Sequence, residues 1–116
     1  MPAEVILRRA RSEEAEALAE ISRRAFETDI AVGAPAPGGP PGHASAEWQA
    51  RMMAAGHYHA ILVDGDLAGG AIVFEMGPGH YELGRLFLEP DRQGQGIGKR
   101  VMARLFGAYP DAERWT

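Results

Sequence analysis

A glycine-rich stretch between Arg92 and Lys99 contains the residues best suited to bind a ligand. It follows a predicted strand and opens a predicted helix, so the unpaired main-chain N–H groups of the first helical turn point into the mouth of the loop. Three alternating glycines let a ligand approach that main chain, and the helix dipole favours negative charge there. Arg92, Lys99 and Arg100 add attraction for an anion. The stretch therefore predicts a site for a phosphate or a pyrophosphate.

Two common phosphate-binding loops do not fit this stretch. A P-loop needs a serine or threonine after its Gly-Lys pair, but Arg100 follows Lys99, and Gln93 stands where the first glycine belongs. A dinucleotide fingerprint needs Gly-x-Gly-x-x-Gly in an early strand–helix–strand unit. Here the glycines alternate, and they come late in the chain, after predicted antiparallel hairpins. Both alternatives fail on spacing and on context.

The charge of the chain is unevenly distributed. The formal net charge of −4 argues against a nucleic-acid-binding protein. Four of the 12 basic residues nevertheless lie between Arg92 and Arg104, a stretch without a single acidic residue. On charge alone, this stretch is a solvated helix face. The glycine-rich loop beside it favours the alternative, one anionic ligand bound at one place.

Length and composition set the protein class. A chain of 116 residues and 12.5 kDa is expected to form a single domain over residues 1–116. No apolar run approaches the ~18 residues that span a bilayer, and no signal peptide is apparent. The absence of cysteine excludes disulfides, thiolate zinc sites and a cysteine nucleophile, and it fits a reducing compartment. We expect a cytoplasmic protein that binds neither membranes nor nucleic acid.

The hydrophobic pattern predicts the order β-α-α-β-β-β-α. Ser12 and Ser45 are interpreted as helix caps rather than nucleophiles, and Gly56 is expected to end the second helix. Trp48, Met52 and Ala55 are expected to form the buried stripe of that helix. Asp64-Gly65 is typical of a hairpin turn. The predicted strands are 5–9, 58–63, 67–75 and 80–88, and the first and third helices are predicted at 12–27 and 97–108. Residues 33–42 are interpreted as a surface linker, with a substrate lid as the alternative. The fold class is α/β (α+β), with a mixed and mostly antiparallel sheet.

The sequence resembles the GNAT superfamily of acyl-CoA-dependent N-acetyltransferases. The family signature, Gln/Arg-x-x-Gly-x-Gly/Ala, is matched by Gln93-Gly94-Gln95-Gly96-Ile97-Gly98. The preceding strand that ends in an apolar residue, an acid and Pro90 also matches, as does the order of elements. The resemblance implies a GNAT-like three-layer fold over nearly all of the chain, with acetyl-CoA as co-substrate.

The resemblance also implies which residues bind coenzyme A. Main-chain groups of Leu86, Phe87 and Leu88 would pair with the pantetheine arm as if it were another strand. Backbone amides of the loop would hold the pyrophosphate. The cofactor-binding residues expected on this basis are Leu86, Phe87, Leu88, Gln93, Gly94, Gln95, Gly96, Ile97, Gly98 and Lys99. The side chains of residues 86–88 are themselves expected in the core.

Glu82 is the candidate catalytic residue. Many family members have a glutamate six residues before the last apolar position of this strand, and Glu82 stands six before Leu88. It would take a proton from a primary amine, directly or through water. Strict alternation places it on the face of Leu86 and Leu88, and a bulge would change that. The alternative role is a surface acid or a partner of Arg85.

Other polar residues receive simpler interpretations. Stabilisation of the oxyanion is expected from a main-chain N–H at Leu88 or nearby. His57, His59 and His80 are poor metal ligands, and no metal is expected. His80 and Tyr81 could line the acceptor pocket. The acceptor is expected to be a small molecule or a peptide with a primary amine, but no residue indicates which one.

The sequence departs from the family pattern at its C-terminal end. Family members continue with another strand, a helix and a hairpin, and that part carries a tyrosine that protonates the leaving thiolate; Tyr109 does not match it. We therefore expect a homodimer, or association with a missing C-terminal fragment. The leading hypothesis is acetyl transfer by direct attack in a ternary complex. The alternatives are a non-catalytic remnant that binds coenzyme A and a phosphate-binding interaction module.

Overall fold

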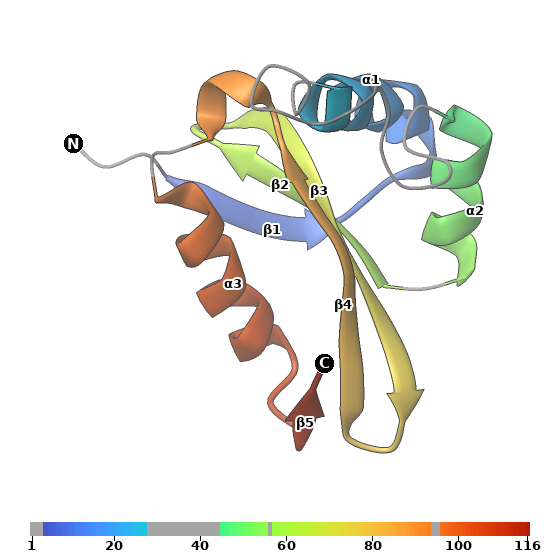
Figure 1. Cartoon of the computed structure of the whole chain (residues 1–116), viewed down its shortest axis with the longest axis vertical. Helices are drawn as coiled ribbons and strands as arrows, with labels where there is room; N and C mark the ends of the chain where they lie inside the picture. Colours follow the sequence, from blue (N-terminus) through green and yellow to red (C-terminus); the bar gives the residue numbers. More distant parts are fainter. Residues whose placement is uncertain (1–3, 28–44, 56, 94–95) are drawn as a thin grey trace.

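A computed structural model describes residues 4–27, 45–55, 57–93 and 96–116. The five strands form one sheet in the order β1-β2-β3-β4-β5, antiparallel except for the β4–β5 pair. The helices cover both faces, α1 and α2 on one and α3 on the other (Figure 1). The bounds are β1 Val5–Arg9, α1 Ala15–Glu27, α2 Ala46–Ala55, β2 His57–Val63, β3 Asp66–Gly77, β4 His80–Leu88, α3 Ile97–Ala108 and β5 Arg114–Trp115. The predicted three-layer α+β fold is confirmed.

Each face of the sheet has its own hydrophobic core. Ile97, Val101 and Leu105 of α3 pack on one face, because their spacing of four residues places them along one side of the helix. Ala108 is exposed. Leu18 of α1 and Tyr58 of β2 lie in the core on the opposite face. Among the residues described, no helix has the length and apolar character needed to span a bilayer.

The start of α1 corrects the prediction that Ser12 caps it. Ser12 lies inside a short 3-10 turn, and Arg11 occupies the cap position. The carboxylate of Glu14 stabilises this turn by accepting hydrogen bonds from the Arg11 main-chain N–H at 2.9 Å and from both terminal nitrogens of Arg8 at 2.8 and 2.7 Å. The hydrogen bonds from Arg8 lower the pKa of Glu14 to about 2. The carboxylate of Glu14, two residues further along, thus has the stabilising role that was predicted for Ser12.

Ser45 does cap α2, since its hydroxyl accepts the Trp48 N–H at 3.1 Å. The predicted buried stripe of α2 is wrong at two of its three positions, and the side chain of the third, Ala55, lies outside those described. Trp48 and Met52 are half-buried, whereas Gln49 and Met53 are buried. Gln49 is buried because its side-chain oxygen accepts the Tyr58 hydroxyl. Two further predictions, the stop at Gly56 and the 33–42 loop, lie outside the described residues.

Two turns follow the sequence signals closely. Asp64 and Gly65 both have positive φ, 52° and 86°, as a two-residue hairpin between β2 and β3 requires. Pro78 and Gly79 join β3 to β4. This second hairpin extends beyond the helices, with β5 beside it (Figure 1).

A β-bulge at Gly84 interrupts the β3–β4 ladder. Val73 pairs with Leu83 and Ile72 pairs with Arg85, so Gly84 is the extra residue of β4. A Cβ at Gly84 would lie 2.2 Å from the ring of Phe74, and only glycine leaves room for that ring. The bulge reverses the alternation of β4, so that Leu83, Leu86 and the next alternate residue Leu88 all contact the core under α3.

Candidate functional site

The edge of β4 remote from β3 is paired along only part of its length in the described structure. β5 pairs with His80 and Tyr81. Thr116 then continues this pairing, accepting the Leu83 N–H at 3.2 Å and donating its own N–H to the Tyr81 carbonyl at 3.0 Å. The edge from Gly84 to Leu88 is open beyond that point. Such an edge can bind an extended ligand that carries amides.

The ladder determines which main-chain groups lie on the open edge. The Glu89 N–H donates to the Ala68 carbonyl at 2.7 Å, so these two residues form a hydrogen-bonded pair. Pairs alternate along an antiparallel ladder, and the N–H and C=O groups of Leu86 and Leu88 therefore point away from β3. The Leu88 carbonyl accepts the side-chain amide of Gln93 at 3.1 Å. The N–H groups of Leu86 and Leu88 have no hydrogen-bond partner within the described structure.

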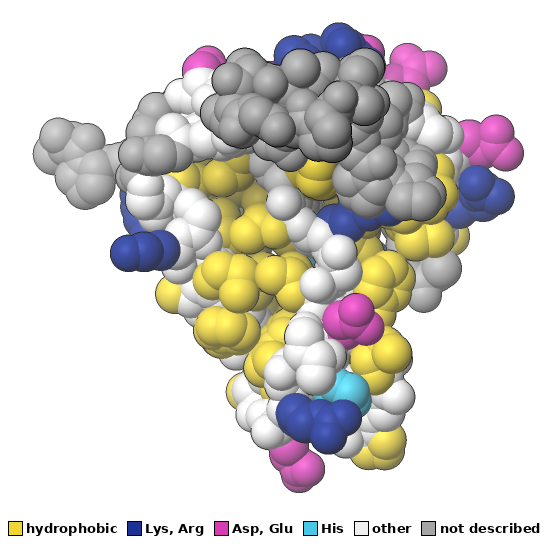
Figure 2. Space-filling view, in the orientation of Figure 1, with side chains coloured by type: hydrophobic (Ala, Val, Ile, Leu, Met, Phe, Trp, Pro, Cys, Tyr) yellow, Lys and Arg dark blue, Asp and Glu magenta, His cyan; other side chains and the backbone are white. Residues whose placement is uncertain are grey.

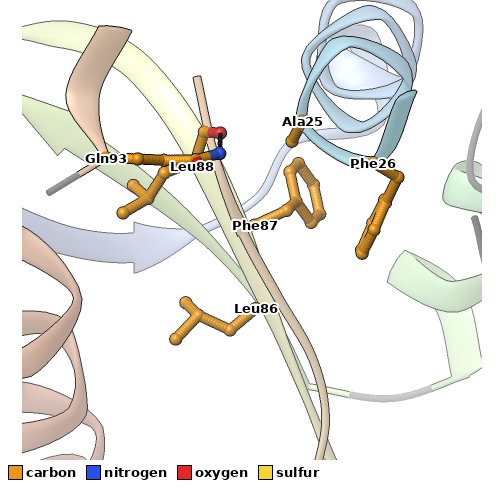
Figure 3. A pocket seen from close by; sticks show the side chains of 6 residues that line it. All are labelled: Ala25, Phe26, Leu86, Phe87, Leu88 and Gln93. Atoms are coloured by element: carbon orange, nitrogen blue, oxygen red, sulfur yellow. Dashed lines mark hydrogen bonds between the residues drawn. The ribbon is translucent and has the colours of Figure 1, made fainter. Parts of the chain in front are cut away.

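A pocket of about 280 Å³ lies at this edge. Figure 3 shows that β4 separates its walls, with Leu86 and Leu88 on one side and Phe87 on the other, facing Ala25 and Phe26 of α1. The rings of Phe26 and Phe87 are 6.2 Å apart. Hydrophobic side chains also gather on this face of the molecule between α3 and β4 (Figure 2). The pocket is thus apolar, and its lining residues include Leu86 and Leu88, whose main-chain N–H groups lie on the open edge.

The loop after β4 leads to an open helix start. Gly96 is the N-cap of α3 with φ of 76°, in the left-handed region that favours glycine. A Cβ at Gly96 or at Gly98 would meet no described atom within 4 Å, so the main chain there is accessible to a ligand. The side chain of Ile97 is buried, so this residue could contact a ligand at the helix start only through its main-chain N–H. Lys99 is exposed, and Gly94 and Gln95 lie outside the described residues.

Glu82 lies on the α1–α2 face of the sheet. It pairs with Phe74, which packs in the core on that face. Strict alternation had placed Glu82 with Leu86 and Leu88, and the bulge places it on the opposite face from both. Glu82 is half-buried, and its carboxylate makes no hydrogen bond or ion pair with any residue described, Arg85 included. The guanidinium of Arg85 instead lies 3.9 Å above the ring of Trp48.

The histidines and tyrosines near the far end of the sheet have structural contacts. His59 Nε2 lies 2.6 Å from the Tyr109 hydroxyl, and the His57 ring contacts the Tyr109 ring edge-on. Burial raises the pKa of Tyr109 to about 12. Tyr81 donates to Asp111 at 2.8 Å and packs on the face opposite Glu82, so it does not line a pocket with that residue. Among the residues described, no cluster of side chains could hold a metal ion.

Sequence reasoning missed the α1 wall of the pocket and one ion pair beside it. Ala25 is buried and Phe26 is half-buried, and nothing in the sequence pairs either residue with β4. Arg24 forms an ion pair with Glu89, with two nitrogen–oxygen contacts of 2.9 and 2.8 Å. These contacts join segments 65 residues apart. The side chain of Gln93 contacts the main chain of β4, a role that the signature motif does not specify.

The fold matches solved acetyltransferases. PaiA N-acetyltransferase from Thermoplasma acidophilum, solved with coenzyme A, has a TM-score of 0.74 at 18% identity over 92% of this chain and 72% of its own. An acetyltransferase from Thermus thermophilus gives 0.70 at 15% identity, over 93% and 71%. RimL, a ribosomal-protein acetyltransferase solved with coenzyme A, gives 0.71 at 18% identity, over 96% and 68%. At these identities the likeness shows the fold alone.

Sequence comparison identifies the family. A search of curated proteins found no match to this chain. The model of the acetyltransferase (GNAT) family matches residues 15–114, which is most of the sequence. That range includes the open edge of β4, the pocket and the glycine-rich loop. The chain belongs to the GNAT acetyltransferase family.

Proposed function

We propose that this protein transfers an acetyl group from acetyl-CoA to a primary amine by direct attack in a ternary complex. Membership of the family supports acyl-CoA-dependent acetyl transfer in general. The observation that carries the specific proposal is the open edge of β4. Its free N–H groups at Leu86 and Leu88 line an apolar pocket that leads to the start of α3.

The residues at this edge fit coenzyme A. Its pantetheine arm contains two amides on a flexible chain, which suits a strand edge that offers N–H donors within an apolar pocket. Leu86 and Leu88 would bind that arm through their main-chain groups. The same role was expected of Phe87, but its main-chain groups point toward Gly70 of β3, so it could contact the arm only through its side chain. Its pyrophosphate suits the first turn of α3, where Gly96 and Gly98 leave the main chain accessible. Main-chain amides from Gly94 to Lys99 would hold the pyrophosphate, because the Gln93 N–H already donates to the Pro90 carbonyl at 3.4 Å.

The positions of these two subsites orient the co-substrate. With its anionic end at α3, beside Leu88, an arm laid along β4 extends toward the Gly84 bulge. The open N–H nearest that end belongs to Leu86, and it would donate a hydrogen bond to the acetyl carbonyl oxygen as negative charge develops there. Leu88 would then bind the arm itself. The expected oxyanion donor is thereby refined from Leu88 to its neighbour on the same edge.

Acetyl-CoA supplies an acetyl thioester and, after transfer, a thiolate leaving group. The lone pair of a neutral amine attacks the carbonyl carbon, a carbon–nitrogen bond forms, and the carbon–sulfur bond breaks. Glu82, half-buried and with no ion-pair partner among the described residues, would accept the proton that the amine loses, directly or through water. The thiolate takes a proton from water.

Thiol release from acetyl-CoA tests the proposal, measured with a panel of small and peptide amines. Amine-dependent release with stoichiometric acetylated product, identified by mass spectrometry, is the expected result. Binding of coenzyme A by calorimetry without turnover on any amine would favour the non-catalytic alternative. Absence of both binding and turnover would overturn the assignment of the edge and the loop.

A further inference from the structure

One ion pair links α1, beside its wall of the pocket, to the residue that follows β4. Arg24 of α1 donates from Nε to one carboxylate oxygen of Glu89 at 2.9 Å and from a terminal nitrogen to the other at 2.8 Å. This parallel, two-bond arrangement fixes direction as well as distance. Arg24 also lies 3.3 Å from Glu20 of its own helix, so the guanidinium is held from both sides.

Glu89 occupies the junction between the two proposed subsites. It directly follows Leu88, whose N–H lies on the open edge, and it precedes the turn Pro90–Arg92 that leads to Gln93. Its own N–H is bonded to Ala68 of β3. Arg24 directly precedes Ala25 and Phe26, which form the α1 wall of the pocket. The pair thus connects that wall to the point where β4 becomes the anion-binding loop.

The exposure of this pair indicates what it contributes. The two side chains are 41% and 25% exposed, and exposed pairs of this kind add little to the stability of a fold. Their geometry matters more, because a ligand that binds two subsites at once is sensitive to the distance between them. Holding that distance in the free protein removes an ordering cost from binding.

We propose that Arg24 is a positioning residue that acts through Glu89 to hold the end of β4 and the anion-binding loop at the spacing one ligand needs. The inference rests on the proposed function, since that ligand is coenzyme A. Loss of the pair lets the junction move relative to α1. A ligand that spans both subsites then binds more weakly, whereas a ligand confined to the loop does not.

Calorimetric binding of coenzyme A and of ADP separates these effects, because ADP carries a pyrophosphate without the pantetheine arm. For Arg24→Gln we expect the Kd of coenzyme A to rise about fivefold, the bias that an exposed pair can impose, while the Kd of ADP stays within about twofold. Arg23→Gln is the matched control, since it removes the neighbouring arginine of α1, whose ion pair with Glu20 stays within the helix. Glu89→Gln removes the other half of the pair and should weaken binding of coenzyme A as selectively as Arg24→Gln does.

Three results would overturn the positioning role. Equal weakening of coenzyme A and ADP would mean that Arg24 acts as a positive charge rather than through Glu89. An unchanged Kd for coenzyme A would mean that the pair does not matter. Unchanged binding of coenzyme A by Glu89→Gln would exclude action through the pair. If Arg24→Gln does not fold, Arg24→Lys keeps the charge without the two-bond geometry and should show the same selective loss.

Failure of the proposed function gives a different result. Wild-type protein that binds ADP but not coenzyme A, or that binds neither, would contradict the assignment of the subsites themselves. The positioning role is therefore judged on a wild-type protein shown to bind both ligands.

Discussion

Gly96→Asp should abolish the stabilisation that coenzyme A gives to the protein. At a concentration 100 times its Kd, a ligand that binds only the folded state adds about 2.7 kcal/mol to the free energy of unfolding. That raises the Tm of a domain of this size by about 10 °C. A carboxylate about 4 Å from a phosphate charge near a protein surface opposes binding by about 4 kcal/mol, or roughly 1,000-fold in Kd. The same concentration of coenzyme A would then add less than about 0.1 kcal/mol to the free energy of unfolding of the Gly96→Asp variant. Thermal unfolding with and without coenzyme A measures the difference.

Two controls separate charge from backbone strain. Gly96 has φ of 76° and Gly65 has φ of 86°, and at each position an added Cβ meets no described atom within 4 Å. Gly65→Asn should therefore lower stability by about as much as a substitution at Gly96, of order 1–2 kcal/mol of backbone strain. It should leave the Tm shift caused by coenzyme A unchanged. Gly96→Asn has nearly the volume of aspartate without its charge, so it should keep part of that shift. Equal shifts in wild type and Gly96→Asp would refute the assignment of this loop.

Three further predictions concern separate parts of the molecule. Glu82→Gln should lower kcat by roughly 10²–10⁴ and leave the Kd of coenzyme A nearly unchanged in a thiol-release assay; unaltered turnover across pH would return Glu82 to a surface role. Burial, with the nearby charges of His57 and Arg9, lowers the pKa of His59, so the free energy of unfolding should fall as pH drops below about 6.5. This loss of stability should be smaller in His59→Phe. If the wild-type denaturation curves were identical from pH 7.5 to 5.5, the predicted pH dependence would be contradicted. The Phe106 side chain on α3 is 46% exposed, so we expect self-association through this helix, and a monomeric mass by light scattering would exclude it.

Local signals in the sequence predict most of the fold. β4 begins and ends where its pattern places it, at His80 and Leu88, because a turn precedes it and Pro90 follows it. Asp64-Gly65 predicts its hairpin because the positive φ angles that the turn needs are favoured by these residue types. α3 keeps its predicted bounds because apolar residues recur at helical spacing after a glycine-rich stretch. In each case neighbours in sequence supply the physical cause.

Contacts between distant segments explain what the sequence does not predict. Gln49 is buried in place of Trp48 because Tyr58, on the next strand, donates a hydrogen bond to it. Glu14 replaces Ser12 at the start of α1 because Arg8 of β1 binds its carboxylate. The pairing of Arg24 with Glu89 depends on where α1 crosses the end of β4. Each outcome depends on a partner that periodicity and propensity do not identify.

The bulge at Gly84 has the largest consequence for the proposed chemistry. Without it, Glu82 would share a face with Leu86 and Leu88, and the base and the apolar lining of the pocket would compete for the same space. With it, Glu82 faces the α1–α2 side, while the N–H groups of Leu86 and Leu88 point along the plane of the sheet, off its edge. An amine could then approach from the α1–α2 side while coenzyme A occupies the edge. Direct attack in a ternary complex requires that arrangement, because the amine and the thioester must be bound together.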